Sequence, residues 1–398
     1  MEIKTVEECF YHIQNGANIK QGVVEGGYPV TRIETISNDK FNRDKMGYAG
    51  IENIDKYISY VLEDGDLLMS HINSIQYLGR TVLYEKQENE IIIHGMNLLR
   101  LKADCSLINQ RYARYYFCSH TFREQVMRIT KKSVNQASFA VSDLKRIKIR
   151  LPKLIEQEKI AIILDKTNKL ISLYKMQIQK LDELIKSKFV EMFGDMANPM
   201  CLHFRCTLAE CCQSENDIKC GPFGTQLNKG EYQEEGVAVW EIPQINSGFS
   251  EKPAHYITVE KANELSAYSL IPGDIAMSRK GNVGRCGLYP EDFEPGIIHS
   301  DVLRIRVDRE IVNPCFMMYQ LHFSRDIQHQ IETVSSGAIM AGVNVTKLKN
   351  IYVYVPNYTE QLVFEDFVKQ TDKLKATVQK ALDETQLLFD SLMQEYFE

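Results

Sequence analysis

The chain has 398 residues, 44% of them hydrophobic, and its 47 Lys and Arg against 53 Asp and Glu give a formal net charge of −6. No run of about 18 apolar residues indicates a membrane span, and the acidic start MEIKTVEECF is unlike a secretory signal peptide. We therefore expect a cytoplasmic protein with reduced Cys and with room for two or three domains.

Charge is distributed unevenly along the chain. Residues 1–153 carry 22 Lys and Arg against 18 Asp and Glu, whereas residues 196–357 carry 14 against 19. Within the first block, residues 111–150 hold ten bases and two acids, which fits either a nucleic-acid surface or a solvated helix face. The acidic total excludes a broadly basic protein, so any contact with nucleic acid has to use local patches.

The first 153 residues predict a domain that mixes strands and helices. Residues 1–60 combine short apolar runs with Gly, Asn and Asp, which is typical of strands joined by turns. Strand-like runs continue through 58–101, and helical spacing follows over 108–128. A polar loop at 130–138 then leads to a last strand that ends at Pro152.

Residues 154–194 predict a long helix, because the segment from Glu156 to Phe193 contains neither Pro nor Gly. We place its apolar seam at 3–4 spacing, beginning with Ile160, Ile163, Thr167 and Leu170. At 1.5 Å per residue the helix would be roughly 60 Å long, and a lone helix of this kind is marginal in water. It therefore needs a partner, unless it only stiffens its own domain.

The rest of the chain repeats this plan. Residues 108–193 align with residues 312–397 at a constant offset of 204, so that SDLKRIKIRLP (142–152) meets TKLKNIYVYVP (346–356). A repeat this long indicates two whole domains, at 1–153 and 195–357, followed by helices at 154–194 and 358–398. We expect these helices to form a coiled-coil or subunit interface through apolar residues, namely Ile163, Leu170, Leu181, Leu184, Phe367, Leu374, Val378 and Leu388.

Motifs of catalysis are missing from the sequence. It has no GxxxxGK[ST] loop, GxGxxG turn, HExxH or GxSxG motif, and no Asn/Asp-Pro-Pro-aromatic signature of base-amino methyltransferases. The Cys cluster from Cys201 to Cys220 lacks a CxxC pair, which argues against zinc. His94 and His299 fall at matching repeat positions in strand-like runs, and we interpret them as structural. We predict no catalytic residue and no metal site.

Polar loops remain as candidate binding elements, and they recur at corresponding places in both domains. Arg can pair with guanine edges, Gln and Asn with adenine edges, and Lys with phosphates, although ordinary turns have a similar composition. In the first domain the candidate DNA-binding residues are Thr31, Arg32, His71, Asn73, Gln76, Arg80, Lys131, Lys132, Asn135 and Gln136. In the second domain they are Phe223, Thr225, Gln226, Lys229, Gln244, Asn246, Ser278, Arg279, Lys280, Asn282 and Arg285. The alternative without a DNA contact is that Arg279 and Lys280 only balance the charge of nearby carboxylates.

Four segments of the second half carry a family likeness: GPFGTQL (221–227), IPQINSG (242–248), GDIAMSRKGNVGRCGLY (273–289) and SSGAIMAGVNVTKLKNIYVYVPNYTEQ (335–361). The first half has looser versions, GDLLMS (65–70) and NQASFAVSDLKRIKIRLPKLIEQEKI (135–160). In these segments the chain resembles the DNA-specificity subunit of type I restriction–modification systems.

The resemblance implies an α+β fold in which two homologous α/β-type target recognition domains are each followed by a long helix, the two helices forming an antiparallel coiled coil. Each domain would read one half of a split, asymmetric site in double-stranded DNA. The helices would dock two modification (methyltransferase) subunits, and restriction (translocase/nuclease) subunits would join the complex. S-adenosylmethionine, ATP and Mg would belong to those partners, leaving this chain without a cofactor.

The first domain departs from the family pattern, because NGANIKQGVVEGGY (15–28) replaces the GxFG loop and MSHINSIQYLG (69–79) is three residues longer than its counterpart. We therefore expect the two domains to read different half-sites. Two other interpretations stay open from the residues: a DNA methyltransferase or nuclease with a diverged catalytic motif, and a coiled-coil assembly protein with no DNA role.

Overall fold

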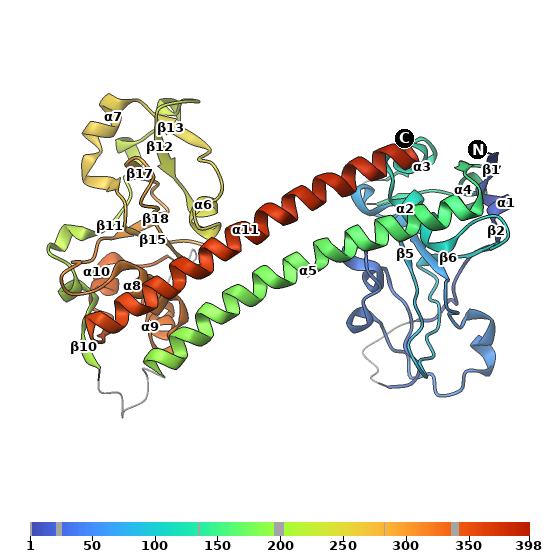
Figure 1. The fold of residues 1–398 in the computed structure, drawn as a ribbon, viewed down its shortest axis with the longest axis horizontal. Coiled ribbons are helices and arrows are strands. Elements are labelled where there is room, and N and C mark those ends of the chain that lie inside the picture. Colours follow the sequence, from blue (N-terminus) through green and yellow to red (C-terminus); the bar gives the residue numbers. More distant parts are fainter. Residues whose placement is uncertain (1, 21–25, 134–135, 195–202, 282, 336–341) are drawn as a thin grey trace. The chain divides into compact units, whose positions relative to one another are not determined.

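The structure is a computed structural model that describes residues 2–20, 26–133, 136–194, 203–281, 283–335 and 342–398. The chain divides into two compact units (Figure 1). The first unit is Met1–Met176 with Gln379–Glu398, and the second unit is Gln177–Val378. Part of each long helix therefore belongs to each unit, and the domain boundaries inferred from the repeat stay a prediction.

The strands of the first unit are β1 (Glu2–Thr5), β2 (Phe10–Asn15), β3 (Leu67–Ser70), β4 (Ile72–Asn73), β5 (Thr81–Leu83), β6 (Leu98–Ala103), β7 (Lys131–Lys132), β8 (Ala137–Ser138) and β9 (Lys148–Leu151). Its shorter helices are α1 (Val6–Cys9), α2 (Gln110–Cys118), α3 (His120–Ile129) and α4 (Val141–Lys145). β1 pairs antiparallel with β9, the main sheet has the order β2-β6-β3-β5, and a small sheet has the order β4-β8-β7.

The strands of the second unit are β10 (Phe204–Thr207), β11 (Ile218–Cys220), β12 (Val237–Trp240), β13 (His255–Ile257), β14 (Ser269–Leu270), β15 (Ile275–Ser278), β16 (Cys286–Leu288), β17 (Gly296–Ile298), β18 (Val302–Ile305) and β19 (Tyr352–Val355). Its shorter helices are α6 (Ile242–Asn246), α7 (Val259–Glu264), α8 (Pro314–Phe323), α9 (Arg325–Ser335) and α10 (Val345–Lys349). β10 pairs with β19, and the two sheets have the orders β11-β18-β15-β16 and β13-β12-β17-β14.

The two units repeat one architecture, which confirms the fold class predicted from the sequence. The order β11-β18-β15-β16 reproduces β2-β6-β3-β5, and the pair β10-β19 reproduces β1-β9. A buried Arg occupies the same strand in each. Arg100 of β6 donates to the carbonyl oxygens of Val61 and Ser59 at 2.9 and 2.7 Å, and Arg304 of β18 donates to those of Ser269 and Asn216 at 2.8 and 2.7 Å. These bonds partner the terminal nitrogens of each buried guanidinium and so lower the cost of burying it, although Nε of both residues has no hydrogen-bond partner in the described part of the chain.

The long helices are α5 (Leu154–Phe193) and α11 (Tyr358–Phe397). In the second unit later residues of α5 contact earlier residues of α11, because Asp182 lies 2.6 Å from Lys375 whereas Lys188 lies 5.9 Å from the ring of Phe367. The helices are therefore antiparallel there. In the first unit the end of α11 enters the core, where the Phe397 ring lies 5.2 Å from that of Tyr112.

Burial corrects the phase of the predicted helix seam. Ile163, Leu170 and Leu184 are 40%, 45% and 47% exposed, and their next neighbours Leu164, Ile171 and Ile185 are buried instead. In α11, likewise, Leu374 and Leu388 are more than half exposed, while Val368 and Leu382 are buried. Those five exposed residues therefore do not form a buried seam, because adjacent apolar positions let the spacing fit two phases; their contact with another subunit stays a prediction. Leu181, Phe367 and Val378 are half-buried.

Within the parts of the chain that the structure describes, no helix is both long and apolar enough to cross a membrane.

Candidate nucleic-acid interface

Predicted loops from four parts of the second unit lie side by side. The guanidinium carbon of Arg279 sits 4.8 Å from the ring centre of Phe223, and the Ser278 hydroxyl lies 3.4 Å from Asn246 Oδ1. The amide of Val343 donates to the carbonyl of Arg279 at 3.1 Å. Chain segments separated by up to 120 residues thus meet in one part of the second unit.

A glycine makes the close approach possible. A Cβ atom on Gly221 would lie 2.2 Å from the carbonyl oxygen of His299, so only Gly fits beside that strand end. The following Phe223 is 46% exposed, and Gly224 has a φ of +60° with open space around it. The loop therefore projects an aromatic ring outward from a backbone that is tightly held at its base.

The predicted residues of the second unit differ in their accessibility. Arg279 and Lys280 are half-buried, and Asn282 lies outside the described residues. The exposed members of the set are Phe223, Thr225, Gln226, Lys229, Asn246 and Arg285. Gln244 and Ser278 are buried, which is a correction to the expected DNA face. Gln244 accepts from the Glu241 amide at 3.3 Å and donates to the Lys252 carbonyl at 3.1 Å, so it supports its loop.

A cluster of polar side chains that sequence reasoning missed lies beside these loops. His255 Nδ1 is 3.0 Å from Glu241 Oε2, and His299 Nε2 is 3.9 Å from Glu241 Oε1. Asp301 lies 3.8 Å from His299 and 2.7 Å from Lys280. This cluster borders a pocket of about 700 Å³ that is lined by Pro222, Gly224, Leu227, Lys229, Tyr232, Glu241, His255, His299 and Ser300.

Strand pairing explains why residues so far apart in sequence meet. β12 runs parallel to β17 and antiparallel to β13, so the ends of β12 and β17 and the start of β13 share one edge. Glu241 follows β12, His299 follows β17, and His255 begins β13. Figure 1 shows β12, β13, β17 and α7 together at one end of this unit, with α8, α9 and α10 beside the start of α11. The sequence signal was present only as single polar residues at strand ends.

In the first unit two of the predicted loops also meet, because β4 and β7 both pair with β8. The amide of Phe139 donates to the carbonyl of His71 at 3.2 Å, as that of Val343 does to Arg279. The exposed members of the predicted set are Arg32, Gln76, Lys131, Lys132 and Gln136, while Asn73 and Arg80 are half-buried. Asn135 lies outside the described residues.

Two predicted residues of the first unit are buried, and their expected place on the DNA face needs the same correction. Thr31 Oγ1 accepts from the Gly95 amide at 2.9 Å. His71 packs against Phe139, and burial lowers its pKa. His94 is fully buried, and burial lowers its pKa to about 3, which agrees with a structural role. His299, in contrast, is partly exposed and faces Glu241.

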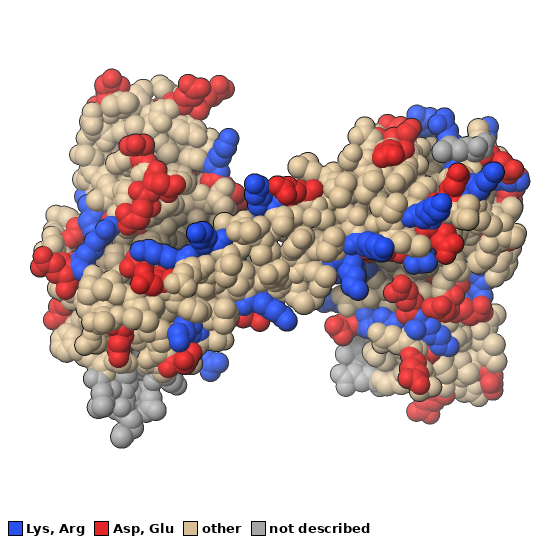
Figure 2. All heavy atoms as spheres, viewed as in Figure 1, with Lys and Arg blue, Asp and Glu red and all other residues tan. Residues whose placement is uncertain are grey.

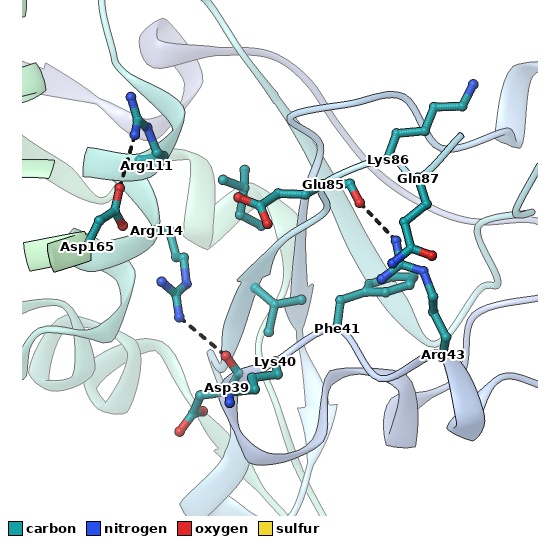
Figure 3. Close-up of a pocket in the computed structure, with 12 residues that line it drawn as sticks. Asp39, Lys40, Phe41, Arg43, Glu85, Lys86, Gln87, Arg111, Arg114 and Asp165 are labelled. Atoms are coloured by element: carbon teal, nitrogen blue, oxygen red, sulfur yellow. Dashed lines mark hydrogen bonds and ion pairs between the residues drawn. The ribbon is translucent and has the colours of Figure 1, made fainter. Parts of the chain in front are cut away.

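A second cavity, of about 410 Å³, lies within the first unit, and Figure 3 shows the residues around it. Five cations border it: Lys40, Arg43, Lys86, Arg111 and Arg114. Arg111 is 3.1 Å from Asp165, and Arg43 donates to the Glu85 carbonyl at 2.9 Å. The carboxylates Asp39, Glu85 and Asp165 also line the cavity. At the offset of 204 the α2 residues Arg111 and Arg114 correspond to Cys315 and Met318, so these two cations have no counterpart in the second unit.

Positive charge is nevertheless local. In Figure 2 acidic and basic side chains are interspersed over the visible face of both units.

In the described part of the chain no three His, Cys, Asp or Glu side chains are placed to hold a metal ion. Of the Cys cluster, Cys206 and Cys211 have their sulfur atoms 3.5 Å apart, and Cys201 is outside the described residues.

Comparison with known proteins gives one consistent result. The family model described as type I restriction modification DNA specificity domain matches residues 2–183 and 218–385. A putative type I restriction enzyme MjaX specificity subunit from Methanocaldococcus jannaschii is 28% identical over 94% of this chain and 87% of its own length. The EcoKI specificity subunit from Escherichia coli is 23% identical over 39% of this chain and 33% of its own length.

Solved structures show the same fold. The S subunit of a type I restriction–modification system from M. genitalium has a TM-score of 0.62 at 15% identity, covering 100% of this chain and 96% of that one. A chain from a structure on complex assembly and conformational transition of the type I R-M system has a TM-score of 0.57 at 14% identity, covering 100% and 97%.

Proposed function

Because this chain belongs to the family of type I restriction modification DNA specificity domains, we propose that it reads a two-part DNA sequence and performs no catalysis itself. The observation that carries the proposal is the repeated unit: the same strand order presents different polar residues on corresponding loops. Two recognition units that share one fold but differ in their contact residues suit an asymmetric DNA site. The family match gives no support to a diverged methyltransferase or nuclease.

The exposed apolar row on the long helices suits protein partners. Leu170 and Leu374 correspond at the offset of 204, as do Leu184 and Leu388, and all four are 45% or more exposed. Exposed apolar side chains that gather on one surface often mark an interaction site. Equivalent rows on two related helices fit two copies of one partner, the modification subunit, which would hold S-adenosylmethionine. Restriction subunits with ATP and Mg would join the complex in the cytoplasm.

The test is selection from a random library of duplex DNA by the full chain assembled with its modification subunit. Moderate, stated salt is required because phosphate contacts make nonspecific binding strong at low salt. The expected result is two short conserved blocks separated by a spacer of fixed length. A single block, or no enrichment, contradicts the proposal. Binding of S-adenosylmethionine by the isolated chain would support the methyltransferase alternative instead.

A further inference from the structure

We propose that Glu241 reads the exocyclic amino group of a cytosine or adenine in the half-site of the second unit, and that Arg32 reads a guanine from the corresponding place in the first unit. The inference rests on the proposed function and adds to it the class of base that each unit selects at one position. It is argued from the backbone equivalence of the two residues, the contacts of Glu241 and the hydrogen-bonding capacity of each side chain.

Glu241 and Arg32 occupy equivalent backbone positions. Each residue precedes a short helix: Glu241 is the N-cap of α6, and Arg32 is the N-cap of the 3-10 helix Ile33–Asp39. In each case the backbone amide of the cap donates to the side chain three residues later, to Gln244 at 3.3 Å and to Thr35 at 2.8 Å. The preceding strands match as well, because Val30 bridges Ile93 in parallel as Val239 bridges Ile297.

One oxygen of the Glu241 carboxylate is held in place by His255. His255 lies 3.0 Å from Oε2, and the Tyr232 ring stacks on the His255 ring at 4.4 Å. The amide of Asp301 donates to His299 Nδ1 at 3.3 Å, so in the neutral ring the proton sits on Nε2, which faces Glu241 Oε1 at 3.9 Å. The distance between His299 Nε2 and Glu241 Oε1 is longer than a hydrogen bond. Oε1 therefore retains acceptor capacity at the edge of the pocket.

A carboxylate in this place is suited to bases and unsuited to the DNA backbone. It accepts hydrogen bonds only, and phosphates repel it. In the major groove cytosine N4 and adenine N6 offer amino donors, whereas guanine O6 and thymine O4 are acceptors. Glu241 can thus select by repulsion as well as by attraction, because the wrong base sets acceptor against acceptor. Arg32 is exposed and donates only, which matches guanine O6 and N7.

The experiment compares the selected DNA sites of the wild-type complex and four variants of the full chain. Glu241→Gln keeps the shape of the side chain but adds a donor, so discrimination at one base pair of the second unit's half-site should fall by roughly 10- to 100-fold. Glu241→Arg should shift that position toward guanine. Arg32→Ala should relax one position in the other half-site only. Glu260→Gln, an exposed carboxylate on α7 outside the pocket, is the matched control and should leave the site unchanged.

The outcomes separate the inference from the proposed function. If the wild-type complex selects a two-part site and both Glu241 variants, verified as folded by thermal melting, select the same site, the inference is overturned and the proposed function stands. The same holds if Glu241→Gln weakens binding to every sequence equally. If the wild-type complex enriches no sequence, the proposed function fails and the inference fails with it.

Discussion

Phe189 of α5 and Phe364 of α11 pack edge to face, with ring centroids 5.5 Å apart and ring planes at 73°. Both side chains are buried in the core of the second unit, so the pair joins the end of one long helix to the start of the other. We expect Phe364→Ala to destabilise the protein by about 3–5 kcal/mol, because it removes transfer energy and leaves a cavity. Urea denaturation of the full chain measures the change.

Leu374→Ala is the control for this prediction, because Leu374 lies on the same helix but is 58% exposed. Its effect on the free energy of unfolding should stay within about 0.5 kcal/mol. A Leu374→Ala cost as large as that of Phe364→Ala would restore the seam predicted from the sequence.

The helices show what the sequence could determine and what it could not. The absence of Pro and Gly and the 3–4 spacing were sufficient to predict two helices that pair. The phase was ambiguous, because Ile163 and Leu164, and again Leu170 and Ile171, are apolar neighbours. Packing against the rest of each unit decides which of the two rows is buried, and that information is tertiary.

The exposed apolar row should bind the modification subunits. Leu170→Lys and Leu374→Lys place a charge on an exposed position, so each should leave folding intact and weaken the docking of one partner copy. The double variant should lose both copies. Light-scattering mass of the assembled complex measures the stoichiometry, with Ile58→Lys, exposed at 62% in the 3-10 helix Asp55–Tyr60, as the control. Two bound partners in the double variant would contradict the prediction.

Lys131 and Lys132 should contribute phosphate contacts. Both are exposed on β7, which pairs with β8 beside the loop 69–80. Replacing both by Gln should weaken binding to every sequence alike and lower the slope of log K against log salt by up to roughly 1.8, which corresponds to two phosphates. Replacement of the exposed Lys45 and Lys56 is the control. An unchanged slope in the first variant would place β7 away from the duplex.

The candidate site was less predictable than the fold. Glycine-bearing loops were visible in the sequence, but the cluster of Glu241, His255 and His299 depends on two strand pairings, one of them parallel. Local patterns do not encode such contacts. The prediction for Gln244 was wrong for the opposite reason. Its side-chain amide is suited to a base contact, but its hydrogen bonds are made within its own loop.

Stability should fall in acid through Glu90. Arg43 donates Nε to Oε2 at 2.8 Å and Nη2 to Oε1 at 2.6 Å, and hydrogen bonding lowers the pKa of Glu90 to about 2. The pKa of a Glu in the unfolded chain is about 4.3, so the folded state binds fewer protons than the unfolded state between pH 2 and that pH. The stabilisation is complete above that pH and is lost as the pH falls toward 2.

Glu90→Gln tests this assignment. At pH 7 it should cost about 2 kcal/mol, since it removes charge-assisted hydrogen bonds, and the deficit should shrink between about pH 4.5 and pH 2. Denaturation curves at pH 7 and pH 3 measure the difference, and the exposed Glu88→Gln should show neither effect. A deficit for Glu90→Gln that is independent of pH would mean that packing rather than charge is responsible.

Arg279, Lys280 and Gln244 should give three different results when each is changed to Ala. Arg279 is half-buried over Phe223 and donates Nε to the Val343 carbonyl at 3.3 Å, which leaves guanidinium donors to meet a base edge. Its loss should cost about 1–3 kcal/mol of binding and relax one position of one half-site. Lys280 is paired with Asp301 at 2.7 Å, and Lys280→Ala should weaken binding evenly across sequences because a Lys contacts phosphates rather than base edges. Gln244 is buried, so Gln244→Ala should mainly lower the thermal stability of the protein.

The measurement for these three variants is a binding profile over all single-base variants of the selected site, combined with a thermal melt for each protein. An Arg279→Ala profile identical to wild type would show that this guanidinium only balances local charge and holds its loop.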